Sequence, residues 1–258
     1  MPDSLTLNSH LYEEVDSRKW EGGRLTLVFL VRHAHSTANA RNILSGRIEG
    51  VHLSELGKIQ SRSLSKRLGS STIKTVRSSP LERCAETIAP WMKRRTKEGF
   101  NPGLNLIFDE GLIEADYGTW SGRALKSLSK EPLWKKVQSR PSAVTFPGGE
   151  SMLAMQKRAM RSVESALATR GKGNIVLVSH GDVIKSVIAA SLSMDLDHFQ
   201  RIVVDPASIS ILDYSSSTPR LLLMNDSRSV IESSTLSSRA KGALIGGGAG
   251  PRTRKGNV

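Results

Sequence analysis

The sequence is poor in cysteine, in aromatic side chains and in long apolar runs. The single cysteine among 258 residues excludes an internal disulfide, so we expect a protein of a reducing compartment, the cytoplasm. The N-terminus lacks the basic-then-apolar pattern of a secretory signal. The longest apolar run, Leu25–Val31, has seven residues. A membrane-spanning helix needs about 20, so we expect no membrane partner.

Acidic residues are scarce relative to basic ones, with 24 Asp and Glu against 37 Lys and Arg and a net charge of +13. A basic surface can attract nucleic acid or small anionic molecules. Five of the positive charges lie in the acid-free stretch Ser233–Val258, and much of the rest follows helical segments in the manner of solvated faces. Aromatic residues are not interleaved with the basic ones. Nucleic acid is therefore not an expected partner, apart from the basic tail.

Strand-like and helix-like segments alternate through the middle of the chain. Six segments rich in strand-forming or apolar residues are predicted as strands: 25–31, 75–77, 105–108, 174–178, 208–214 and 221–224. Helical patterns with start or stop signals predict helices: from the N-cap Ser54 to Gly69, from Pro80 through Trp91, over 150–170 and over 181–193. Residues 111–149 read as loop-rich. This alternation predicts a layered α/β sheet.

Polar clusters follow the first, second and fourth predicted strands. They contain Arg32-His33, Arg83 in the first turn of a helix, and His180-Gly181. A further helix is expected near Ser36. Ligands of open α/β sheets bind at the carboxyl ends of strands. Because guanidinium groups grip phosphate through paired hydrogen bonds and a neutral imidazole can attack phosphorus, these clusters predict a phosphate pocket.

Such a pocket also needs a proton donor for the leaving alkoxide. Glu114, in the loop-rich stretch, is a carboxyl of the right kind. Asp116 and Asp182 are equally eligible on chemistry alone.

Taken in order, these residues resemble the histidine phosphatase superfamily, also called phosphoglycerate mutase-like, over about residues 25–225. The resemblance rests on these motifs: Arg32-His33, Asn39, Ser45-Gly46, Ser54–Gly57, Ser78-Ser79-Pro80 with Arg83 and Thr87, Glu114–Gly118, Pro147–Ser151 and His180-Gly181. It implies a three-layer α/β/α sandwich with a mixed, mostly parallel central sheet. It also implies that neither a metal nor another cofactor is needed.

The resemblance assigns a role to each matched residue. His33 would be the phosphorylated nucleophile, and Glu114, rather than Asp116 or Asp182, the proton donor. The other residues expected at the site are Arg32, Arg83 and His180 around the phosphate, and Asn39, Ser45, Gly46 and Gly181 as substrate contacts.

Two positions depart from the superfamily's usual pattern of Gly and then often Glu after the nucleophile. Here they are Ala34 and His35. Ala34 would be strained if its position required a positive φ. His35 could shift the preference toward more anionic substrates.

The sequence thus predicts a metal-independent phosphomonoester hydrolase, acting on a small phosphorylated metabolite through a phosphohistidine. Its catalytic domain would span 24–232, between an N-terminal extension (1–23) and a basic tail (233–258) with the composition of a disordered segment. A phosphoglycerate-type mutase is the enzymatic alternative, and the short stretch between Glu114 and Pro147 favours hydrolysis. A non-catalytic phospholigand-binding protein is the alternative from another class. A homodimer is left open.

Overall fold

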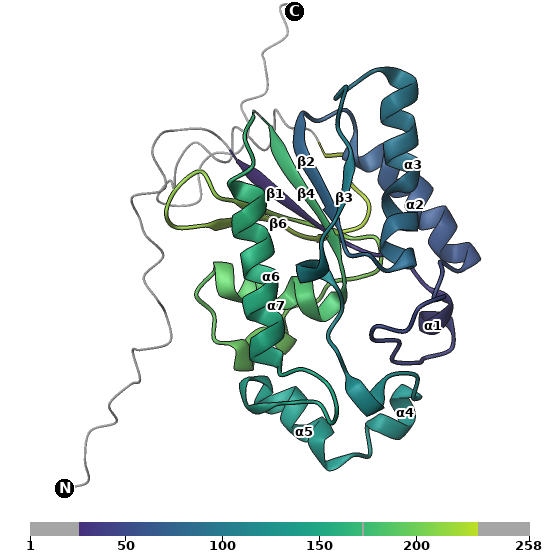
Figure 1. The fold of residues 1–258 in the computed structure, drawn as a ribbon, viewed down its shortest axis with the longest axis vertical. Helices are drawn as coiled ribbons and strands as arrows, with labels where there is room; N and C mark the ends of the chain where they lie inside the picture. The colour runs from purple at the N-terminus through teal and green to yellow at the C-terminus, as the bar shows by residue number, and fades with distance from the viewer. Residues whose placement is uncertain (1–25, 172, 232–258) are drawn as a thin grey trace, which may run out of the picture.

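The computed structural model describes residues 26–171 and 173–231 (Figure 1). The predicted N-terminal extension 1–23 and the basic tail 233–258 lie outside the described residues. Within the described ranges, no helix combines the length and apolarity needed to cross a bilayer.

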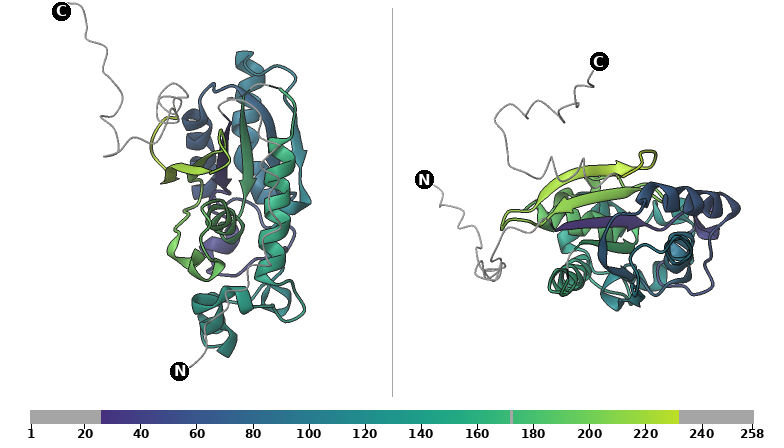
Figure 2. Two further views of the ribbon diagram at one scale, coloured as in Figure 1. Left: turned by 90° about the vertical axis from the view of Figure 1, so that its left-hand side faces the viewer. Right: turned by 90° about the horizontal axis from the view of Figure 1, so that it is seen from above.

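A six-stranded sheet with the order β3-β2-β4-β1-β5-β6 forms the centre of the molecule. The strands are β1 (Leu27–Arg32), β2 (Ile73–Ser78), β3 (Leu106–Phe108), β4 (Asn174–Ser179), β5 (Ile209–Asp213) and β6 (Arg220–Asp226). The first four run parallel, whereas β5 is antiparallel to β1 and β6 is antiparallel to β5. Figure 2 shows β6, in yellow, along the outer edge. The predicted mixed, mostly parallel sheet is confirmed.

The continuous apolar run of β1 reflects burial on both faces of the sheet. Val28 and Leu30 point into one core, while Phe29 and Val31 point into the other. Successive side chains of a strand alternate between faces, so a strand covered on both sides must be apolar at every position. β4 is buried along its whole length for the same reason.

Helices cover the two faces of the sheet (Figure 1). α2 (Glu55–Leu68) and α3 (Glu82–Glu98) contribute Leu64, Ile88 and Trp91 to one core. α6 (Met152–Leu167) and α7 (Gly181–Ser191) contribute to the other. The three-layer α/β/α sandwich is therefore confirmed. The remaining helical segments are short: α1 (Thr37–Ala40), η3 (Glu110–Leu112), η4 (Gly118–Trp120), α4 (Leu125–Leu128), α5 (Pro132–Ser139), η5 (Pro141–Ala143) and η6 (Leu196–Arg201).

The prediction that Pro80 opens a helix is wrong by two residues. α3 begins at Glu82 after the extended residue Leu81, and Pro80 lies in the turn before it. Proline fixes φ at a value that suits a turn as well as a first helical position, so the residue type does not separate the two. Arg83 keeps its predicted place in the first helical turn.

The predicted loop-rich stretch 111–149 contains a helix of two turns, α5, that was not predicted. α5 starts with Pro132 at its first position, and proline is a residue type that signals a helix start as well as a turn. Leu128, Val137 and Phe146 of this stretch are buried against the core on the α6 and α7 side. The segment is therefore a packed part of the fold, and it leads from η3 to α6.

Candidate active site

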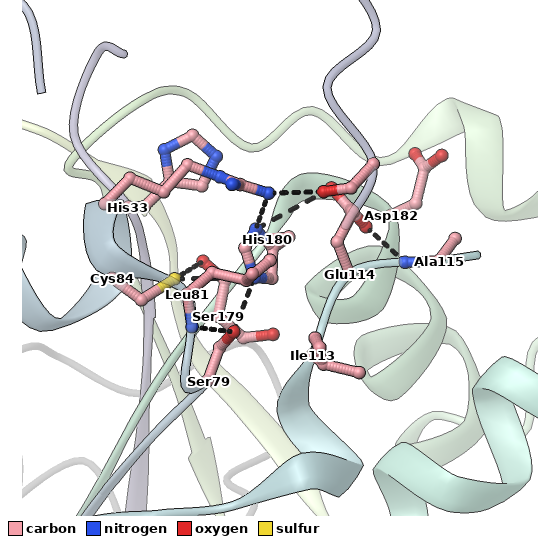
Figure 3. A network of polar contacts seen from close by, with 12 residues as sticks. His33, Ser79, Leu81, Cys84, Ile113, Glu114, Ala115, Ser179, His180 and Asp182 are labelled. Carbon is pink, nitrogen blue, oxygen red and sulfur yellow. Dashed lines mark hydrogen bonds and ion pairs between the residues drawn. The ribbon is translucent and has the colours of Figure 1, made fainter. Parts of the chain in front are cut away.

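The first and third predicted clusters of the site, Arg32-His33 and His180-Gly181, meet because β1 and β4 are neighbouring parallel strands. Arg32 at the end of β1 pairs with Ser179 at the end of β4. His33 and His180 each follow directly, and the His33 N–H donates to the Ser179 carbonyl over 2.9 Å. Their ring centroids are 5.2 Å apart. Two histidines separated by most of the chain thus lie side by side, as Figure 3 shows.

The His33 ring has its tautomer set by the backbone. Its Nδ1 lies 2.8 Å from the Ala34 carbonyl oxygen. A carbonyl oxygen only accepts, so Nδ1 carries the proton. Burial, followed by the charges of Arg83 and Arg32, holds the pKa of His33 well below its usual value. The ring is therefore neutral, and its Nε2 carries a free lone pair.

Arg83 is a fully buried cation, and only part of its guanidinium group is hydrogen-bonded within the described residues. Its Nη2 donates to the Gly46 carbonyl over 2.7 Å and reaches Nδ1 of His180 at 3.3 Å. Its Nε and Nη1 meet no acceptor among the described residues, and neither does Nε of Arg32. Buried donors are nearly always paired in folded proteins. Unpaired guanidinium nitrogens beside two histidines indicate a place for an anion.

His180 has the opposite tautomer to His33. A guanidinium only donates, so Nδ1 of His180 accepts from Arg83 and Nε2 carries the proton. Nε2 lies 2.8 Å from the hydroxyl oxygen of Ser79. Burial, then Arg83, lowers the pKa of His180 well below its usual value. Ser79 directly follows β2, at the same sheet edge, and it orients this ring.

Glu114 joins the cluster from the irregular segment that follows η3. Its Oε1 accepts from the Ala115 N–H over 2.9 Å, and its Oε2 lies 3.8 Å from Nδ1 of His180. Burial, and after it the charge of Asp182, raise the pKa of Glu114 to about 7. A carboxyl with that pKa can hold a proton at neutral pH and release it to a substrate.

Asp116 and Asp182, the other two candidates for the proton donor, lie in different surroundings from Glu114. The Asp116 side chain is 39% exposed and accepts from the Gly118 N–H. Asp182 accepts from the Tyr117 hydroxyl and from Lys185. Figure 3 shows Asp182 next to Glu114. Of the three carboxyls, Glu114 is the buried one whose pKa is raised.

With this geometry in place, the comparisons with known proteins identify the family. The sequence profile described as "Histidine phosphatase superfamily (branch 1)" matches residues 28–227. The chain belongs to this superfamily. The predicted family, and with it the assignment as a histidine phosphatase enzyme, is confirmed.

Relatives within the superfamily carry several names. Phosphoserine phosphatase 1 of Hydrogenobacter thermophilus is 29% identical over 203 residues, which cover 77% of this chain and 91% of that protein. "Probable phosphoglycerate mutase GpmB" of Yersinia pestis is 27% identical over 192 residues, 74% of this chain and 86% of that protein. The solved mycobacterial glucosyl-3-phosphoglycerate phosphatase Rv2419c, in complex with VO3, has a TM-score of 0.68 at 24% identity. It covers 78% of this chain and 98% of its own, which shows a shared fold.

The predicted substrate contacts lie at different distances from this cluster. Gly46 contacts Arg83 through its carbonyl, and a Cβ on Gly181 would sit 3.5 Å from the Arg32 guanidinium. Ser45 precedes Gly46 and is half-buried. Asn39 instead completes the capping box of α1, because its Oδ1 accepts from the N–H and hydroxyl of the N-cap residue Ser36. Its role as a substrate contact stays a prediction.

The two departures from the superfamily pattern are accommodated without strain. Ala34 is fully buried, is not among the residues with positive φ, and its N–H donates to Thr87. Nδ1 of His35 lies 2.8 Å from the Ser54 hydroxyl at the start of α2. The strain considered for Ala34 is therefore absent, and the His35 ring contacts the N-cap residue of α2.

Ser79 belongs to the Ser78-Ser79-Pro80 motif but was not among the predicted site residues. Its position after the second predicted strand was the available signal, because that strand end meets the others at one edge.

Proposed function

We propose that this chain hydrolyses phosphomonoesters of small metabolites without a metal, through a phosphohistidine on His33. One observation carries the proposal: fully buried Arg83 keeps two guanidinium nitrogens without an acceptor among the described residues, beside a neutral His33. A phosphoryl group would satisfy these donors. It would also face the lone pair of His33 Nε2.

In the first step, His33 Nε2 attacks phosphorus in line with the leaving oxygen. The P–N bond forms and the P–O bond to the leaving group breaks, while Glu114 gives its proton to the departing oxygen. Arg32, Arg83 and His180 surround the transferring group and stabilise the charge on its equatorial oxygens. A raised pKa of about 7 supports Glu114 in this role, because a large share of the carboxyl is then protonated at neutral pH and more of it below.

In the second step, water attacks the phosphohistidine. Glu114, now a carboxylate, takes a proton from the water as the P–N bond breaks. Inorganic phosphate leaves, and His33 returns to its neutral state. One carboxyl thus acts as an acid and then as a base.

Hydrolysis is favoured over phosphoryl transfer to a second substrate hydroxyl. The stretch between Glu114 and Pro147 holds only short helices whose buried side chains pack into the core of the fold. It supplies no long insertion to cover a retained intermediate. The names of the relatives suggest small phosphorylated acids as the first substrates to examine. A cytoplasmic location stays a prediction from cysteine usage.

The test is phosphate release from p-nitrophenyl phosphate and a panel of alkyl phosphates, including O-phosphoserine, between about pH 5 and pH 8 with chelator present. His33→Ala should lower turnover by about 10⁴-fold or more. His198→Ala, which removes an exposed histidine of η6, is the matched control and should stay within about threefold of wild type. Activity that needs a metal, or that survives in His33→Ala, would refute the proposal. No turnover of any ester would favour a narrow mutase or a binding protein.

A further inference from the structure

Glu114 lies in a segment that has no regular secondary structure to hold it. Residues Ile113–Tyr117 run between η3 and η4 without a helix or strand assignment. A general acid must meet the leaving oxygen within hydrogen-bond reach. Some other interaction must therefore fix the backbone of this segment.

Arg158 of α6 grips that backbone from one side. Its Nη1 donates to the carbonyls of Gly111 and Ile113 over 2.9 and 2.6 Å. Its Nη2 donates to the Glu114 carbonyl over 3.0 Å. Three carbonyl groups within four residues are thus held by one guanidinium, which is 14% exposed.

Glu150 holds Arg158 in place and reaches the same segment itself. Its Oε1 and Oε2 accept from Nη2 and Nε of Arg158 over 2.6 and 3.1 Å, a two-point contact. Oε1 also accepts from the Asp116 N–H over 2.9 Å. Charge-assisted, two-point contacts between a guanidinium and a carboxylate fix orientation as well as distance. The carboxylate thereby ties the far end of the segment to α6.

Arg47 completes the arrangement from the loop that follows Gly46. Its Nε donates to the Glu114 carbonyl over 2.9 Å and its Nη2 to Glu150 over 2.9 Å. The Glu114 carbonyl therefore accepts from two guanidinium groups. We refer to Arg47, Glu150 and Arg158 together as the carbonyl clamp.

We propose that the carbonyl clamp positions the proton donor: Arg158 and Glu150, with Arg47, hold the Glu114 backbone so that its carboxyl meets the leaving oxygen. None of the three side chains is assigned a contact with the reacting atoms. They are positioning residues, and this role rests on the function proposed above for Glu114. Lysine cannot replace Arg158 in this role, because a single ammonium cannot bind Glu150 at two points and three carbonyls at once.

The test compares two leaving groups. An alkyl phosphate expels a strongly basic alkoxide that needs the proton of Glu114, whereas p-nitrophenyl phosphate expels a weakly basic phenolate that does not. Glu114→Gln should therefore lower kcat/KM for the best alkyl phosphate of the panel by about 10²–10⁴-fold. It should change kcat/KM for the aryl ester far less.

Arg158→Lys and Glu150→Gln should show the same selectivity, with a loss of about 10- to 100-fold on the alkyl ester and less than about threefold on the aryl ester. The ratio of the two values is independent of the amount of folded protein, so partial unfolding does not imitate the result. Arg161→Lys, an exposed arginine on the same helix, is the control and should leave the ratio unchanged.

Equal losses on both esters in Arg158→Lys and Glu150→Gln, while Glu114→Gln remains selective, would overturn the positioning role and leave the proposed function standing. If Glu114→Gln shows no selectivity either, Glu114 is not the proton donor, and the proposed mechanism fails instead.

Discussion

The two halves of the candidate site are built in different ways. The phosphate half, with His33, His180 and Arg32, stands at the ends of two adjacent strands whose hydrogen-bonded register places its residues. The donor half, with Glu114, stands on an irregular segment that side chains from distant elements hold in place. The hydrogen bonds of the sheet therefore fix the positions of the residues in the phosphate half. The position of Glu114 in the donor half depends on a few polar contacts made by side chains.

Apart from loss of the proposed nucleophile or proton donor, the largest effect should come from removing Arg83, the buried cation of α3 beside the phosphate half. Arg83→Met should lower kcat/KM by at least about 10²–10³-fold, because the charge on the phosphoryl oxygens loses its main stabilising donors. Its thermal unfolding midpoint should fall less than that of Arg95→Met, because two buried nitrogens of Arg83 lack an acceptor among the described residues, against one of Arg95.

Arg95→Met provides the reverse pattern on the same helix. Arg95 is also buried but donates to the Asn101 carbonyl, away from the site. Its loss should cost about 1–3 kcal/mol of unfolding free energy with kcat/KM unchanged. If Arg83→Met were instead destabilised like Arg95→Met and still active, the phosphate half would be structural.

A second prediction concerns a substitution that shifts the backbone of the donor half. Gly118 has a φ of +52°, and a Cβ there would lie 2.1 Å from the Pro147 carbonyl oxygen. Gly118→Ala must separate the segment after Glu114 from the turn that leads to Glu150. We expect a loss of about 100-fold in kcat/KM for an alkyl phosphate.

Gly122→Ala is the control that introduces backbone strain without the clash with the Pro147 carbonyl. Gly122 also has a positive φ, of +82°, but a Cβ there meets only the end of the Ile48 side chain at 3.2 Å. Both variants should be less stable than wild type, because alanine is strained at a positive φ. Gly122→Ala should nevertheless keep most of its activity. Equal losses of kcat/KM in both variants would show that the close packing against Pro147 does not matter.

The smallest effect is a shift in pH dependence, because a change in the charges around Glu114 alters its pKa without moving its carboxyl. Four groups act on the Glu114 carboxyl or lie beside it: Asp182, Arg83, Arg32 and His180. With a pKa of about 7, Glu114 loses its proton as the pH rises through neutrality, so kcat/KM for alkyl esters should fall above about pH 7. His33, whose pKa is lowered, should add no limb there.

Asp182→Asn should move this alkaline limb to lower pH. The negative charge of Asp182 disfavours the carboxylate form of Glu114 and so raises its pKa, and the amide removes that charge. Lys185→Gln should move the limb the other way, because Lys185 partly neutralises Asp182. A limb that stays in place in both variants would assign it to a group other than Glu114.

The strand ends that carry His33 and His180 could be predicted from the sequence. A strand buried on both faces leaves a continuous apolar run, and a polar cluster directly after it marks the carboxyl end. His33 and His180 were located in this way. The start of α3 was placed two residues early and α5 was missed, because a proline fits both a turn and a first helical position.

The sequence predicted Glu114 as the proton donor only through the family resemblance. The residues by themselves did not separate Glu114 from Asp116 and Asp182, since all three are carboxylates. The structure separates them by burial and by their partners: Glu114 is buried with a raised pKa, Asp116 is exposed, and Asp182 is bound to Tyr117 and Lys185.

The sequence by itself determined the family, the layered sheet and the strand ends that carry the two histidines, because periodicity and order along the chain report on local structure. Only the tertiary structure decided the tautomers of the histidines, the pKa of Glu114 and the carbonyl clamp. Arg47 and Arg158 lie 67 and 44 residues from Glu114 along the chain. No local pattern encodes a contact between side chain and backbone across such distances, because it depends on how the loops and α6 pack in three dimensions.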